Sequence, residues 1–119
     1  MYKFAALNFA LAVSLLWSVP CLSHAKLQGS VPAANAQLAH APPTLTLNFS
    51  EDALLAVLKL TTSGTAVPVT VDRGAKPSSA VVVALPALKP GKYVIEWSAI
   101  AADDGHITKG SFSFTILGD

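Results

Sequence analysis

A carboxylate and an imidazole lie two positions apart near the C-terminal end of the chain, at Asp104 and His106. Gly105 separates them, and because glycine has no Cβ it allows the backbone to bend so that both side chains point toward one place. Carboxylate oxygen and imidazole nitrogen both serve as ligands for metal ions. Their spacing therefore predicts part of a metal site.

A second histidine, His24, could complete this site from the other end of the chain. Proteolysis directly before His24 would leave a residue whose α-amine and imidazole can chelate one ion together. With Asp104 and His106 the ligands would be two imidazoles, an amine and a carboxylate, a set that favours tetragonal Cu(II) over softer ions. We therefore expect a Cu(II) site. The alternative is a solvated loop, since Asp-Gly is a common turn pair, with His24 discarded in a leader peptide.

The N-terminus has the organisation of a secretory signal peptide. Lys3 provides a positive start, residues 4–19 are almost wholly apolar, and Pro20 interrupts the run. The apolar run is shorter than the roughly 20 residues of a membrane span, and small residues typical of a processing site follow it. We expect this segment to be cleaved and the remainder to be exported.

Two cleavage positions satisfy the small-residue rule. Cleavage after Ser23 would release His24, whereas cleavage after Ala25 would release Lys26 and remove the first proposed ligand. The peptidase pattern alone favours the second position. Cys21 would be lipidated in a lipoprotein, but the residues before it match that processing signal poorly.

Composition limits the function of residues 24–119. The only cysteine, Cys21, lies in the leader, so disulfides and thiolate sites are excluded. Without Lys3 the chain carries seven basic and seven acidic residues, and no basic cluster exists that could bind a phosphate backbone. We expect a single domain that does not bind nucleic acid.

Alternation of apolar and polar residues predicts an antiparallel β-sandwich of seven short strands. The pattern ends the strand at residues 44–49 in a turn at residues 50–52, and a strand resumes at residue 57. The leucines and alanines of residues 53–60 could also form a helix, but we favour a short irregular turn followed by the strand. The seven expected strands are residues 26–31, 44–49, 57–62, 67–71, 80–85, 92–98 and 111–116. The expected core is Leu45, Leu47, Phe49, Leu58, Leu60, Val82, Tyr93, Ile95, Trp97, Phe112 and Phe114.

Five short segments, in order, carry a family resemblance. They are HAKL at 24–27, PAANA at 32–36, LTLNFSE at 45–51, LKPGKY at 88–93, and DGH at 104–106 with the strand that continues to Phe114. Together they resemble the periplasmic copper-resistance proteins of the CopC/YobA type. The resemblance implies an Ig-like or cupredoxin-like Greek-key sandwich at residues 24–119, after a signal peptide at residues 1–23.

The resemblance also implies specific roles. Relatives of this kind begin with histidine after processing, which favours cleavage after Ser23. The resemblance further implies that Glu51 lies near the copper as a supporting residue. It implies a periplasmic carrier or buffer for Cu(II) that passes copper to an inner-membrane protein of the CopD type, and we expect a monomer. Some members hold Cu(I) through a methionine-rich stretch, but the only methionine here is Met1, so we expect no such site.

Two other functions remain open at this point. Amine-plus-imidazole copper sites also occur in oxidative polysaccharide-cleaving enzymes, although the aromatic residues here occupy core-type positions and offer no substrate platform. The third possibility is a metal-free Ig-like interaction module. His40 matches no expected ligand and is expected at the surface.

Overall fold

The computed structural model describes residues 25–118, in which seven β-strands are joined by turns and loops. The strands are β1 (Leu27–Val31), β2 (Gln37–Leu38), β3 (Thr44–Thr62), β4 (Thr65–Val67), β5 (Ser78–Ala84), β6 (Gly91–Ala101) and β7 (Ile107–Ile116). The predicted signal peptide and His24 lie outside the described residues. No helix in the described part is long and apolar enough to cross a membrane.

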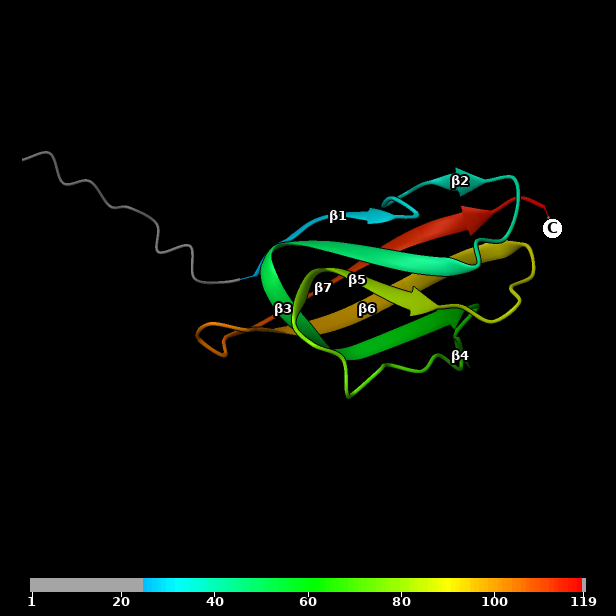
Figure 1. Ribbon diagram of the computed structural model, residues 1–119. Coiled ribbons are helices and arrows are strands. Elements are labelled where there is room, and N and C mark those ends of the chain that lie inside the picture. The colour runs from blue at the N-terminus through cyan, green and yellow to red at the C-terminus, as the bar shows by residue number, and fades with distance from the viewer. Residues whose placement is uncertain (1–24, 119) are drawn as a thin grey trace, which may run out of the picture.

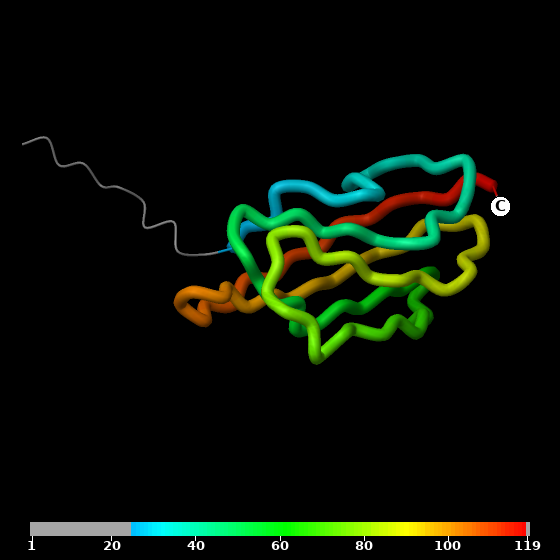
Figure 2. Tube along the Cα trace, viewed as in Figure 1, coloured from blue at the N-terminus to red at the C-terminus, as the bar shows by residue number. Residues whose placement is uncertain are grey.

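The long strand β3 organises the fold because it belongs to two layers. Its first limb, residues 44–50, pairs antiparallel with β1 and with β5, while its second limb, residues 53–62, pairs antiparallel with β4 and β6. The sheet continues from β6 to β7 and ends with the short parallel strand β2. Between the limbs β3 bends, so that the sheet curls and β5 passes in front of β6 and β7 (Figures 1 and 2). This confirms the predicted all-β sandwich.

Alternate side chains from both layers fill the space between them. Leu45 and Leu47 of the first limb and Ile95 of β6 are fully buried, and Phe114 of β7 is 1% exposed. Aromatic rings join the layers: the Phe49 and Trp97 centroids lie 5.4 Å apart in an edge-to-face arrangement, a geometry that aromatic pairs favour. The alternation read from the sequence is therefore the alternation that builds the core.

The predicted break after residue 49 is wrong, because β3 runs through residues 50–56 as continuous strand. The register shifts between Asn48 and Ala53 against β5, and between Leu55 and Val57 against β6. Such irregularities let a strand bend without leaving the extended conformation. The two predicted strands are therefore the two limbs of one strand, and we call residues 50–53, where the limbs meet, the β3 corner.

The predicted strand at residues 67–71 is mostly wrong, since β4 ends at Val67. Pro68 has no N–H to donate to a ladder, so pairing stops there. A strand that was not predicted, β2, pairs in parallel with Thr115 and Ile116 of β7. Two residues are too few for a periodic pattern.

One predicted core residue is wrong: Val82 is 63% exposed, and its neighbour Val83 is buried at 4%. The run from Ala80 to Ala84 is apolar throughout, so no alternation reveals which residues point inward. The register decides it, because Val83 lies opposite the buried Leu45 and takes the same face. Phe112 is only partly buried and packs against the edge of the core.

Candidate metal centre

The predicted Asp-Gly-His sequence lies in the hairpin loop between β6 and β7. The loop is closed by two backbone hydrogen bonds, from Ala101 N to His106 O (2.9 Å) and from Gly105 N to Ala101 O (3.0 Å). Gly105 has a φ of 73°, a left-handed conformation that costs other L-residues about 1–2 kcal/mol. The predicted reason for glycine at this position, backbone bending between two ligands, agrees with this conformation.

Asp104 and His106 contact each other directly. Asp104 Oδ1 accepts a hydrogen bond from the His106 backbone N–H at 3.0 Å, and Asp104 Oδ2 lies 2.8 Å from His106 Nδ1. A carboxylate can only accept, so the short distance to Nδ1 requires the proton on that nitrogen. Coordination of a metal by this imidazole would therefore use Nε2. This is the arrangement in which a carboxylate fixes the ring orientation of a ligating histidine.

The pair is accessible from solvent. The His106 side chain is 58% exposed and that of Asp104 is 24% exposed. An ion pair this exposed contributes little to folding stability, commonly 0–1 kcal/mol.

The start of the described chain is fixed beside this loop. Ala25 is fully buried, and its carbonyl oxygen accepts a hydrogen bond from the Thr108 hydroxyl at 2.7 Å, two positions beyond His106. The next residue, Lys26, exchanges two hydrogen bonds with Ser50: its N–H donates to Ser50 Oγ (2.9 Å), and Ser50 N donates to its carbonyl (2.8 Å). The residue bonded to Ala25 is His24, the predicted first ligand.

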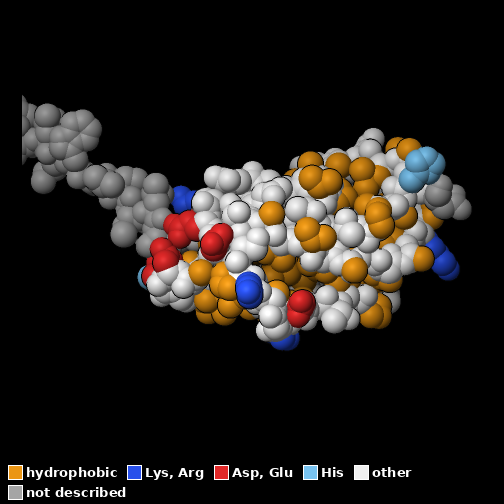
Figure 3. All heavy atoms as spheres, in the orientation of Figure 1, with side chains coloured by type: hydrophobic (Ala, Val, Ile, Leu, Met, Phe, Trp, Pro, Cys, Tyr) orange, Lys and Arg blue, Asp and Glu red, His pale blue; other side chains and the backbone are white. Residues whose placement is uncertain are grey.

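The β3 corner contacts the other side of the loop. Ala102 N donates to Asp52 O at 3.0 Å, and Glu51, Asp52, Ala102 and Asp103 line a shallow depression of about 320 Å³. The predicted supporting residue Glu51 is half-buried at this depression. Acidic side chains gather at this end of the molecule (Figure 3).

The loop and the β3 corner bring Asp104, His106 and Glu51 to one end of the sandwich, with the chain start beside them. Within residues 25–118 no group of three or more His, Cys, Asp or Glu side chains is arranged to hold a metal ion. The described donors alone, one imidazole and one carboxylate, are therefore an incomplete site. Thr108 and Ser50 were not predicted from the sequence. Their partners at the chain start lie 83 and 24 positions away, respectively, and no local pattern identifies contacts over such separations.

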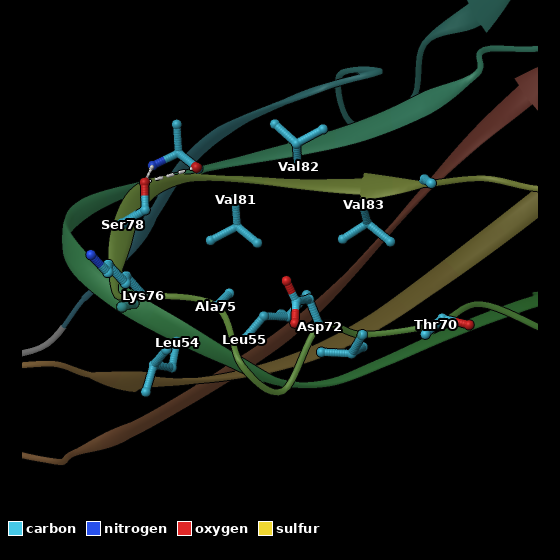
Figure 4. A pocket seen from close by; sticks show the side chains of 14 residues that line it. Leu54, Leu55, Thr70, Asp72, Ala75, Lys76, Ser78, Val81, Val82 and Val83 are labelled. Atoms are coloured by element: carbon cyan, nitrogen blue, oxygen red, sulfur yellow. Dashed lines mark hydrogen bonds between the residues drawn. The ribbon is translucent and has the colours of Figure 1, made fainter.

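A second concavity, about 430 Å³ in volume, lies between β5 and residues 70–76 (Figure 4). Alanine, valine and leucine side chains form most of its lining, and no predicted ligand lines it. Ser78 and Ala80 also line it, and the Ser78 hydroxyl donates to Ala80 O (2.9 Å) and accepts from Ala80 N (3.1 Å). The chemistry suited to a metal ion is at the loop, outside this groove.

Residues 27–117 match the CopC domain family. The chain belongs to the CopC family. It is similar to Protein YobA of Escherichia coli strain K12, with 32% identity over 120 residues that cover 97% of this chain and 92% of YobA. It is also 35% identical over 106 residues to Copper resistance protein C of Escherichia coli, covering 80% of this chain and 82% of that protein. The resemblance read from five short segments is confirmed.

Solved structures of CopC proteins share the fold. The structure of PcoC, a methionine-rich copper resistance protein from Escherichia coli, superposes with a TM-score of 0.63 at 33% identity, covering 78% of this chain and 98% of PcoC. CopC from Methylosinus trichosporium OB3b gives a TM-score of 0.67 at 26% identity, covering 79% and 94%. PcoC is described as methionine-rich, whereas this CopC-family chain contains one methionine.

Proposed function

We propose that this protein is a periplasmic Cu(II) carrier or buffer whose ligands are the α-amine and imidazole of an N-terminal His24, together with Asp104 and His106. The observation that carries the proposal is the hydrogen bond from Thr108 to the Ala25 carbonyl. This contact fixes Ala25, the residue directly after His24 in the sequence, beside the hairpin loop that carries Asp104 and His106. Membership of a family with members named copper resistance proteins supports copper as the cargo.

Burial of Ala25 supports processing after Ser23. Its side chain belongs to the hydrophobic core and is 0% exposed. Cleavage after Ala25 would remove this side chain, and it would also remove the carbonyl that Thr108 contacts. A folded domain that keeps both must begin at or before Ala25, and of the two predicted cleavage positions only the one after Ser23 meets this condition.

The donor set supports Cu(II) as the cargo. Imidazole and amine nitrogens with a carboxylate oxygen suit Cu(II), whereas Cu(I) prefers thioether and thiolate sulfur. The sequence after the leader contains no methionine and no cysteine. A protein with this composition would bind the oxidised ion and release it on reduction.

A carrier role fits the surface better than oxidative catalysis on polysaccharides. Phe49, Tyr93, Trp97 and Phe114 are each between 1% and 6% exposed, so these rings are not available to stack on a sugar chain. Asp104 would also place an anion where an oxygen-activating enzyme needs an open position. We propose that the protein is not an enzyme, that it acts as a monomer, and that an inner-membrane protein of the CopD type receives its copper.

The deciding experiment compares copper stoichiometry in two preparations, one that begins at His24 and one with a single extra leading glycine. The first is expected to bind one Cu(II) per chain, with nitrogen hyperfine structure in electron paramagnetic resonance. The second is expected to bind weakly, because its His24 nitrogen is an amide. Equal binding by both, or unchanged binding after Asp104→Ala and His106→Ala are combined, would contradict the proposal.

A further inference from the structure

The chain start is held from both layers of the sandwich. Thr108 is the second residue of β7, in the layer formed by β6 and β7, and it donates to Ala25 O at 2.7 Å. Ser50 ends the first limb of β3, in the opposite layer, and forms the two hydrogen bonds with Lys26 at 2.8 and 2.9 Å. Three hydrogen bonds thus fix two consecutive residues.

We propose that Thr108 and Ser50 are positioning residues of the metal centre, which clamp residues 25 and 26 beside the loop that carries Asp104 and His106 and so order the chain start next to the proposed ligand His24. This inference rests on the proposed function. Neither residue is a proposed ligand. Their role is to order the N-terminal segment before the ion arrives, since a ligand that is already positioned loses less freedom on binding.

The β3 corner and β7 connect both parts of the site. Ser50 contacts the N-terminal segment, and two residues later Asp52 O accepts from Ala102 N of the loop. Thr108 lies two positions after His106 and contacts Ala25. A shift of the N-terminal segment relative to the loop would therefore break contacts on both sides, and the clamp sets the distance between the two groups of ligands.

Thr108→Val tests the clamp because it keeps the shape of the side chain and removes the hydroxyl. In protein beginning at His24, we expect Cu(II) affinity to fall by about threefold to tenfold, the range that one net hydrogen bond provides. In the metal-free protein, we expect faster hydrogen exchange at the Lys26 amide. Thr108→Ser keeps the hydroxyl and should restore both values. Ser50→Ala, which removes the acceptor for Lys26 N–H, should act in the same direction.

Thr62→Val is the matched control. Its hydroxyl also donates to a backbone carbonyl, that of Lys92 at 2.9 Å, but Lys92 lies near the other end of β6 from the loop. This variant should leave both Cu(II) affinity and Lys26 exchange unchanged.

The two readouts separate two failures. If the Lys26 amide of the Thr108→Val and Ser50→Ala variants exchanges hydrogen at the wild-type rate, these side chains do not order the chain start, and the proposed clamp is wrong whatever the protein binds. If Lys26 exchange accelerates but Cu(II) affinity stays at the wild-type value, the segment is clamped without serving the metal, and the positioning role is overturned. If the wild-type protein beginning at His24 binds no Cu(II), the proposed function fails and the role toward the metal fails with it.

Discussion

At the level of single residues, the centre depends on how Asp104 holds His106. Both oxygens of the carboxylate contact the histidine, one through the backbone N–H and one through Nδ1. The ring is thereby set in one tautomer, in which Nε2 would be the nitrogen that coordinates a metal ion. The Asp104 carboxylate can orient the ring, and its negative charge would also attract the bound cation. A neutral amide side chain at this position would lack that charge.

His106→Ala should weaken Cu(II) binding by at least about 100-fold, more than the 10–100-fold typical of residues that only support a ligand. Folding stability should change by no more than about 0.5 kcal/mol, because the side chain is largely exposed. Isothermal titration and chemical denaturation measure the two quantities. His40→Ala, another exposed histidine, is the control and should leave affinity unchanged; a similar loss there would point to non-specific uptake.

Reduction with ascorbate should release the copper. Residues 24–119 contain neither methionine nor cysteine, so the reduced ion would find none of the sulfur ligands that it prefers. Copper retained through a desalting column under ascorbate and anaerobic conditions would be inconsistent with this site. The same column run without ascorbate is the control.

At the level of secondary structure, the positions of β1, β5, β6, β7 and both limbs of β3 could be predicted, whereas β2 and the end of β4 could not. β6 and β7 alternate in sequence, so strands at residues 92–98 and 111–116 and a loop between them are predicted, although β7 begins earlier, at Ile107. The Asp104 and His106 contact is local and follows from their spacing. The contact between Thr108 and Ala25 depends on how the whole sheet curls, so no window of sequence contains it.

The β3 corner shows the same limit. Its residues, Ser50 to Ala53, have the composition of a turn, yet they stay in strand conformation because the limbs on either side pair with different partners. Strand partners are a property of the folded chain. The choice of Val83 over Val82 for the core was likewise decided by the partner strand.

Gly110 should be required by the packing of β6 on β7. It lies opposite Trp97, and a Cβ at this position would come within 3.0 Å of Trp97 Cζ2. Gly110→Ala should therefore destabilise the fold by about 1–3 kcal/mol, as overpacking does. Urea denaturation measures the change. Gly29→Ala is the control, because its Cβ would meet nothing within 4 Å, and equal destabilisation there would contradict the explanation.

At the level of the whole molecule, the predicted ligands come from parts of the chain that are far apart in sequence, so binding should stabilise the entire fold. Near a free Cu(II) concentration of 100 times Kd, the expected gain is about 2.7 kcal/mol. For a domain of this size, that corresponds to a rise in Tm of about 10–20 °C.

Differential scanning calorimetry with and without Cu(II) measures this rise. It should occur in protein that begins at His24 and be much smaller in protein with one extra leading glycine. The same rise in both preparations would show that Cu(II) binds elsewhere on the fold.

The two ends of the described chain lie at opposite ends of the sandwich (Figure 1). Ala25 begins beside the loop, while Leu117 N donates to Leu38 O beside β2, at 2.7 Å. An affinity handle, fluorophore or sensor surface should therefore be joined after residue 119. Attached there, the protein would expose the proposed copper site to the solution, and a biosensor attached through the N-terminus would block the α-amine that the proposed site requires.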